Sequence, residues 1–200
     1  MKLNRLAIAV AGATFALAAC TNTAEPAAQP KIEVVGPQGE ISLPEGFDRW
    51  PTLGAWATAA GGEGQPVDEM HTVYVSPGGI ESYLVTGEFA DGTVLVKDVR
   101  EAKSTLLTTG DAHWPTDTKV WFVMVKDSSG KHESRPLWAE GWGWALFGSD
   151  DPKKQIAESF ENDCQACHQP TEATEWIYAE AYPVLRKNGE IGSPSWDSEG

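Results

Sequence analysis

The sequence has few of the residues on which metal and redox chemistry depend: three cysteines and four histidines among 200 residues. Basic residues are scarce too, 15 against 29 acidic ones, which gives a formal net charge of −14. Because phosphate binding requires a basic surface, nucleic acid is excluded as an expected partner. There are no internal repeats, and the apolar run of residues 6–19 is too short for a stable membrane-spanning helix. Such acidity fits a soluble protein that meets small neutral molecules or basic redox partners.

The rest of the composition is that of one globular domain. Hydrophobic residues make up 41% and charged residues 22%, which is ordinary for a soluble protein. The length is sufficient for one domain with a real core. Nine tryptophans, 13 prolines and 20 glycines favour a loop-rich, aromatic-rich β fold over a helical bundle.

The N-terminal segment reads as an export signal. Residues 1–5 are short and basic, and the apolar run after them ends in Leu-Ala-Ala-Cys at Cys20. This pattern looks like a bacterial lipobox, which predicts a signal peptide over residues 1–19 and a lipid on Cys20. The alternative is a secretory signal cut beside a stray cysteine. Residues 20–32 then form a flexible tether, and a periplasmic protein anchored by lipid to a bacterial membrane is expected.

The other two cysteines form the motif Cys164-Gln-Ala-Cys167-His168. Such a motif can be a redox dithiol, half of a zinc site or a haem attachment point. A dithiol would need a βαβ context that is missing here, and a zinc site would need two more ligands. The remaining histidines have no partner at ligand spacing: His71, His113 and His132.

Haem attachment needs only what the motif contains. Thiols three residues apart lie on one helical face and can add to the two vinyl groups of one porphyrin, and His168 can bind the iron. The spacing therefore predicts one covalently bound haem c, held by Cys164 and Cys167 with His168 as axial ligand. A helix over residues 152–167 is expected to carry the motif, with Asp151 as its N-cap and Pro152 at its first position.

Four segments are expected to be strands. Residues 70–75 alternate, residues 93–99 follow an Asp-Gly turn, residues 120–125 are β-branched and aromatic, and residues 141–147 are a further candidate. Helices are also expected over residues 78–86 and 172–182, and residues 187–200 are expected to be a loose polar tail. This order predicts an α+β fold, mainly antiparallel sheet with a few helices and a C-terminal haem-binding helix.

The haem motif follows a long β region in the sequence. In this order the chain resembles the cytochrome P460 family, which also includes the cytochromes c′-beta. The resemblance extends from about Leu43 to Arg186. Its strongest parts, besides the haem motif, are residues 71–75 (HTVYV), 86–89 (TGEF), 91–97 (DGTVLVK), 122–127 (FVMVKD) and 182–186 (YPVLR). The resemblance implies a single haem domain over residues 33–186, usually a homodimer, with a proximal histidine and an open distal position.

Lys97 stands where hydroxylamine-oxidising members have a lysine bonded covalently to the porphyrin rim. On composition alone it would be a solvated strand lysine. However, alternation puts it on one face with Leu95 and Val99, so we expect it to point inward.

The predicted distal wall departs from the catalytic members. Phe122 takes the place of their glutamate, and it shares a strand face with Val120 and Met124. His71 occupies the position of a basic residue and is a candidate distal base, with packing at a strand end as the alternative. Met124 is expected to pack rather than to bind iron.

The remaining residues of interest are expected to have structural roles. The tryptophans at 138, 142 and 144 are expected in the core or a dimer interface, and His113 in a loop. Glu175 and Trp176 are expected near the proximal histidine.

Two functions remain open at this stage. One is oxidation of hydroxylamine or NO, with electrons passed to a soluble redox partner. The other is a non-catalytic cytochrome of the c′-beta type that binds NO or transfers electrons.

Overall fold

The computed structural model describes residues 32–59, 61–62 and 64–186. The predicted signal peptide, Cys20, nearly all of the tether and the polar tail lie outside the described residues. Among the described residues, no helix is both long and apolar enough to cross a membrane.

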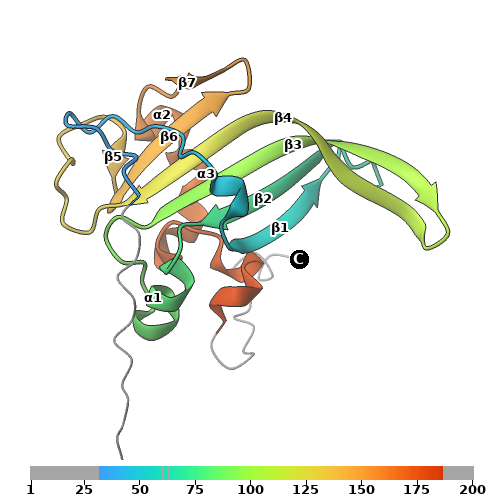
Figure 1. Cartoon of the computed structure of the whole chain (residues 1–200), viewed down its shortest axis with the longest axis horizontal. Helices are drawn as coiled ribbons and strands as arrows, with labels where there is room; N and C mark the ends of the chain where they lie inside the picture. The colour runs from blue at the N-terminus through green and yellow to red at the C-terminus, as the bar shows by residue number, and fades with distance from the viewer. Residues whose placement is uncertain (1–31, 60, 63, 187–200) are drawn as a thin grey trace, which may run out of the picture.

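One antiparallel sheet of seven strands dominates the structure (Figure 1). Its strand order is β1-β2-β3-β4-β6-β5, and β7 pairs with β6. This confirms the expected class, mainly antiparallel sheet with a few helices. The strands are β1 (Thr52–Thr58), β2 (Glu69–Val75), β3 (Val94–Leu107), β4 (Gly110–Lys126), β5 (Trp138–Ala139), β6 (Trp142–Gly148) and β7 (Asp151–Gln155).

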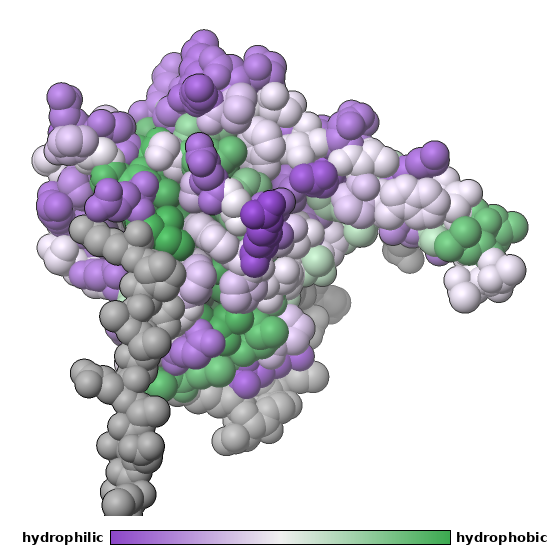
Figure 2. Space-filling view, viewed as in Figure 1, coloured by the Kyte–Doolittle hydropathy of each residue, from purple (hydrophilic) through white to green (hydrophobic). Residues whose placement is uncertain are grey.

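Strands β3 and β4 form a long hairpin that reaches well beyond the rest of the molecule (Figure 1). The expected strands 93–99 and 120–125 are confirmed, but they are only the inner, apolar ends of this hairpin. The outer ends are mostly exposed on both faces, so they carry no alternating pattern. At the tip, Leu106 and Leu107 are 77% and 49% exposed, and Figure 2 shows apolar surface there.

Alternation along the strands divides the core in two. Leu95, Met124 and Trp144 belong to one cluster, which the C-terminal segment and α1 (Gly79–Thr86) cover. The residues that alternate with them, such as Val96 and Ala145, belong to a second cluster on the other face. The N-terminal segment, including η1 (Phe47–Arg49), covers that second face.

The predicted helix over residues 152–167 is wrong. Residues 151–155 form β7 beside β6, and the Gln155 side chain accepts from the Leu146 N–H at 2.7 Å. Pro152 suits this strand because β7 pairs on one side only. The helical part starts later, with Ser159 rather than Asp151 as the N-cap.

The haem-motif helix is short and broken. It consists of α2 (Phe160–Asp163) and α3 (Gln165–His168), which meet at Cys164. The expected helix 78–86 is confirmed as α1, but the helix expected over 172–182 is not continuous. That region contains 3-10 turns: η2 (Gln169–Thr174), η3 (Ala179–Ala181) and η4 (Pro183–Leu185).

Candidate functional site

A cavity of about 390 Å³ lies between the sheet and the C-terminal segment. This volume is in the range of small-molecule and cofactor sites. Strands β1 to β4 and β6 form one wall, and the segment from α2 to η3 forms the other. Its side chains are mostly apolar or aromatic, with a few polar groups: His71, Lys97, Asp163, Cys164, Cys167, His168 and the tyrosines 178 and 182.

The motif residues Cys164, Cys167 and His168 all line this cavity. Helical hydrogen bonds hold them together: the Cys164 N–H donates to the Phe160 carbonyl at 2.9 Å, and the His168 N–H donates to the Cys164 carbonyl at 3.2 Å. Both thiols are free. Burial raises the pKa of the Cys164 thiol to about 12, with smaller contributions from Asp163 and Cys167. Cys167 is the more exposed of the two.

The His168 ring is fixed in one orientation. Its Nδ1 lies 2.7 Å from the Trp176 carbonyl. A carbonyl can only accept, so Nδ1 carries the proton and Nε2 keeps its lone pair for a metal. Trp144 packs edge-on against the ring with centroids 4.7 Å apart. Burial lowers the pKa of His168, which favours the neutral ring that a metal ligand requires.

Lys97 and Phe122 face the cavity from neighbouring strands. They are paired across β3 and β4, and the Lys97 Nζ lies 4.2 Å from the centroid of the Phe122 ring. Lys97 therefore points inward, as alternation predicts. Burial lowers the pKa of this amine, while Cys167 and Glu69 oppose the shift more weakly. A lowered pKa increases the fraction of neutral amine near neutral pH, and only the neutral amine can act as a nucleophile or accept a proton.

His71 reaches the cavity from β2 and stacks on Trp56 with centroids 5.3 Å apart. Its Nε2 lies 3.2 Å from the Glu69 carboxylate, whose other oxygen is paired with Lys119. An ionised carboxylate only accepts, so Nε2 carries the proton and Nδ1 is the basic nitrogen. Among the described residues, Nδ1 is buried and has no hydrogen-bond partner. Burial lowers the pKa of His71, and the Glu69 hydrogen bond opposes that shift.

A family model for cytochrome P460 matches residues 44–179. That range covers the sheet, the hairpin and every cavity residue named so far except Tyr182. The chain belongs to the cytochrome P460 family. No curated protein matches the chain.

Membership in the cytochrome P460 family implies a haem cofactor, and the residues of the cavity fit one. Two free thiols and an imidazole with an available Nε2 converge on a largely apolar space. A porphyrin needs apolar walls and an axial nitrogen of this kind. Cys164, Cys167 and His168 would hold the group.

The other residues that the sequence analysis named do not all reach the cavity. Met124 is part of the cavity wall and of the core cluster. All three tryptophans are buried, but only Trp144 lines the cavity. His113 lies in β4 near the far end of the hairpin, not in a loop, and bonds Ser104. Trp176 contacts His168 through its backbone carbonyl.

Sequence reasoning missed much of the wall. Trp56 comes from β1, a strand that was not expected because its alternation is weak. Tyr178 and Tyr182 come from the segment read as a helix, and Tyr178 donates a short hydrogen bond to the Cys167 carbonyl. Glu69 was missed as the partner of His71, although a residue two positions away on a strand shares its face.

Proposed function

We propose that this cytochrome P460 protein is exported, carries one covalently bound haem c, and oxidises a small nitrogen compound, hydroxylamine or NO. One observation carries the proposal. The residues that can attach and ligate haem face the same cavity as two nitrogen bases, His71 and Lys97.

Attachment follows from the motif residues alone. Each thiol S–H of Cys164 and Cys167 would add across a vinyl double bond of the porphyrin to give a thioether, a step that needs no oxidant. The free Nε2 of His168 would hold the haem iron as its axial ligand. A bound haem would supply an iron that accepts electrons from the substrate and passes them to a soluble redox protein.

Lys97 is the candidate for a further bond to the porphyrin rim. Forming an N–C bond replaces one N–H and one C–H, and the two electrons and two protons released require an oxidant of the peroxide class. A nucleophilic, neutral amine is needed, and the buried position of Lys97 favours that form.

Protons must leave the substrate as it is oxidised, and His71 is the best placed acceptor. It is a neutral imidazole in the cavity wall, and Glu69 fixes its tautomer. Glu69 is paired with Lys119, whose side chain is 44% exposed, so this row of groups leads from the cavity toward solvent.

A second candidate is a non-catalytic cytochrome that binds NO. The apolar wall around Phe122 and Met124 favours it. The cavity-lining carboxylate of Asp163 already accepts the N–H groups of Glu158 and Ser159, at 2.7 and 3.1 Å. An apolar wall suits a neutral diatomic ligand but gives little help to proton removal.

Export and anchoring remain part of the proposal through Cys20. Changing Cys20 to alanine should release a soluble periplasmic protein or block processing, as seen by fractionation. A mature N-terminus without an acyl chain, determined by mass spectrometry, would reject the lipobox interpretation. A homodimer in solution is also proposed, on the basis of the family.

The test of the central proposal combines a gel and a spectrum. Wild-type protein should retain haem on a denaturing gel, and the Cys164→Ala/Cys167→Ala variant should lose it. Haem that persists in this variant would reject covalent attachment. A red-shifted, broadened Soret band in the ferrous protein, lost in Lys97→Ala, would favour the oxidase. An ordinary five-coordinate spectrum would favour the NO-binding candidate.

A further inference from the structure

Two consecutive residues beside the cavity have an unusual backbone. Glu175 has φ 62° and ψ 30°, and Trp176 also has φ 62°. Left-handed geometry is unfavourable for side chains of this size and persists only where the surroundings enforce it. The sequence has no glycine or asparagine here to make the turn easy. Something must therefore hold residues 175–176 in place.

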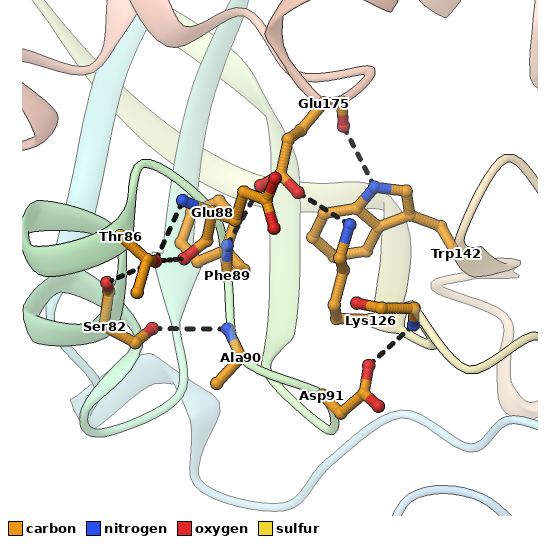
Figure 3. Close-up of polar contacts among 10 residues, drawn as sticks. Ser82, Thr86, Glu88, Phe89, Ala90, Asp91, Lys126, Trp142 and Glu175 are labelled. Atoms are coloured by element: carbon orange, nitrogen blue, oxygen red, sulfur yellow. Dashed lines mark hydrogen bonds and ion pairs between the residues drawn. The ribbon is translucent and has the colours of Figure 1, made fainter.

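The restraint is visible around Glu175 (Figure 3). One carboxylate oxygen bonds the Lys126 Nζ at 2.7 Å, and the other accepts the Phe89 N–H at 3.0 Å. The Glu175 carbonyl accepts the indole N–H of Trp142 at 2.9 Å. Lys126 and Glu175 are 9% and 15% exposed, and the Lys126 ammonium also lies 4.8 Å from the Trp142 ring centroid. All three acceptors of Glu175 are thus bound by residues of β4, β6 and the loop before β3.

The next peptide group is the one that contacts the histidine. The Trp176 N–H donates to the Thr171 carbonyl at 2.9 Å, and its own carbonyl accepts from the His168 Nδ1 at 2.7 Å. The Trp176 ring packs edge-on against Phe160, with centroids 5.4 Å apart. The left-handed turn is what directs this carbonyl at the imidazole, because it reverses the chain after η2.

We propose that Lys126 and Glu175 are a positioning pair for His168. By holding the Trp176 carbonyl against Nδ1, they fix the orientation of the imidazole and raise the basicity of its Nε2. Partners of this kind tune a metal through its ligand. The inference rests on the proposed function for one point, that His168 is the axial ligand of the haem iron.

A buried ion pair adds little to stability compared with apolar residues of similar volume. Its two charged ends do, however, define a geometry that apolar side chains would leave loose. A carboxylate at position 175 is suited to this task, because two oxygens can accept from Lys126 and from Phe89 at once.

The experiment uses the haem-loaded protein and two variants, Glu175→Gln and Lys126→Met. Resonance Raman spectroscopy of the ferrous protein gives the iron–histidine stretching band, and potentiometry gives the midpoint potential. Loosening the Nδ1 hydrogen bond should lower the band frequency and favour the ferrous state. We expect a roughly tenfold change in the ferric–ferrous equilibrium, which corresponds to a rise in midpoint potential of about 59 mV. Lys126→Arg keeps the charge and should restore both values.

Arg100→Met is the matched control. Asp98 is a buried carboxylate paired with Arg100 at the same 2.7 Å distance, on the opposite face of the sheet from Lys97. This variant should lower the melting temperature without moving the band or the potential.

The outcomes separate the two proposals. If Glu175→Gln and Lys126→Met lower the melting temperature but leave the band and potential at wild-type values, the pair is structural only and the inference is overturned. If wild-type protein shows no iron–histidine band, the axial assignment in the proposed function fails, and the inference fails with it. A shifted band that Lys126→Arg restores supports the positioning role, whether or not the protein oxidises hydroxylamine.

Discussion

Replacing Phe122 with glutamate tests whether the cavity lacks a strong base. Phe122 is half-buried and paired with Lys97, whose Nζ lies 4.2 Å from the ring centroid. Burying an unpaired polar group there would cost about 1–3 kcal/mol. A carboxylate near the ammonium of Lys97 would gain up to about 4 kcal/mol at 4 Å in a partly solvated site. The two contributions are of similar size, so we expect Phe122→Glu to fold.

The expected result is faster oxidation of hydroxylamine. General-base help contributes about 10²–10⁴ in rate, and we expect the lower part of this range. The reason is that a charged Lys97 would hold the pKa of the new carboxylate below its ordinary range and weaken it as a base. The assay is steady-state hydroxylamine oxidation with an artificial electron acceptor.

Phe122→Gln is the control, because it has a similar polar side chain and no basic oxygen at neutral pH. An equal gain in Phe122→Gln would mean that polarity or space, rather than a base, was limiting. Brisk turnover in the wild type that Phe122→Glu leaves unchanged would refute the reasoning and identify another base.

Three further predictions concern the fold and its surfaces. A Cβ on Gly54 would lie 2.4 Å from the Ala181 carbonyl oxygen, so Gly54→Ala should cost about 1–3 kcal/mol in urea unfolding. Because burial lowers the pKa of His71, the unfolded chain binds more protons below about pH 6.5, and stability should rise with pH there. His71→Gln should flatten this slope, and an unchanged slope would exclude His71 as its source. If the proposed homodimer forms through the exposed Leu106 and Leu107 at the hairpin tip, changing both to aspartate should give monomers in analytical ultracentrifugation with an unaltered haem spectrum. A variant that stays dimeric would exclude the hairpin tip as the contact.

The sequence predicted the strands whose side chains are buried. The inner ends of β3 and β4 contact a core cluster on each face, so they are apolar and β-branched, and residues 70–75 place Val73 and Val75 in one of these clusters. The outer hairpin has no buried face, so pairing between its strands, rather than patterning, determines it. β1 was missed because Gly54 and small residues weaken its pattern.

The helix predicted over residues 152–167 failed for a related reason. An aspartate followed by proline is a local start signal, but the pairing of β7 with β6 is a long-range contact that overrides local preference. The first four residues of the predicted helix, 152–155, belong to β7, and the helical turns begin only at Phe160.

The candidate site likewise has a part that the sequence predicts and a part that it does not. Spacing alone identified Cys164, Cys167 and His168, and alternation with family resemblance identified Lys97. The restraint on His168 comes from the Trp176 carbonyl, and a backbone group has no signature in the sequence. The sequence placed Glu175 and Trp176 near the proximal histidine, but only the structure shows the positive φ at both residues and the role of the Trp176 carbonyl.

The chemistry of the cavity depends on which of its groups are charged. Burial lowers the pKa of both His71 and Lys97, so each favours its neutral form more than a solvated side chain would. Asp163 is bonded to backbone N–H groups, which hold its pKa below the ordinary value. In the proposed function, the apolar part of the wall admits neutral hydroxylamine or NO without a desolvation penalty for charge. Ligand binding alone requires only the apolar wall. Oxidation also requires a proton acceptor that can release its proton to the solvent. The pairing of His71 with Glu69, and of Glu69 with the exposed Lys119, is the arrangement here that favours oxidation over binding.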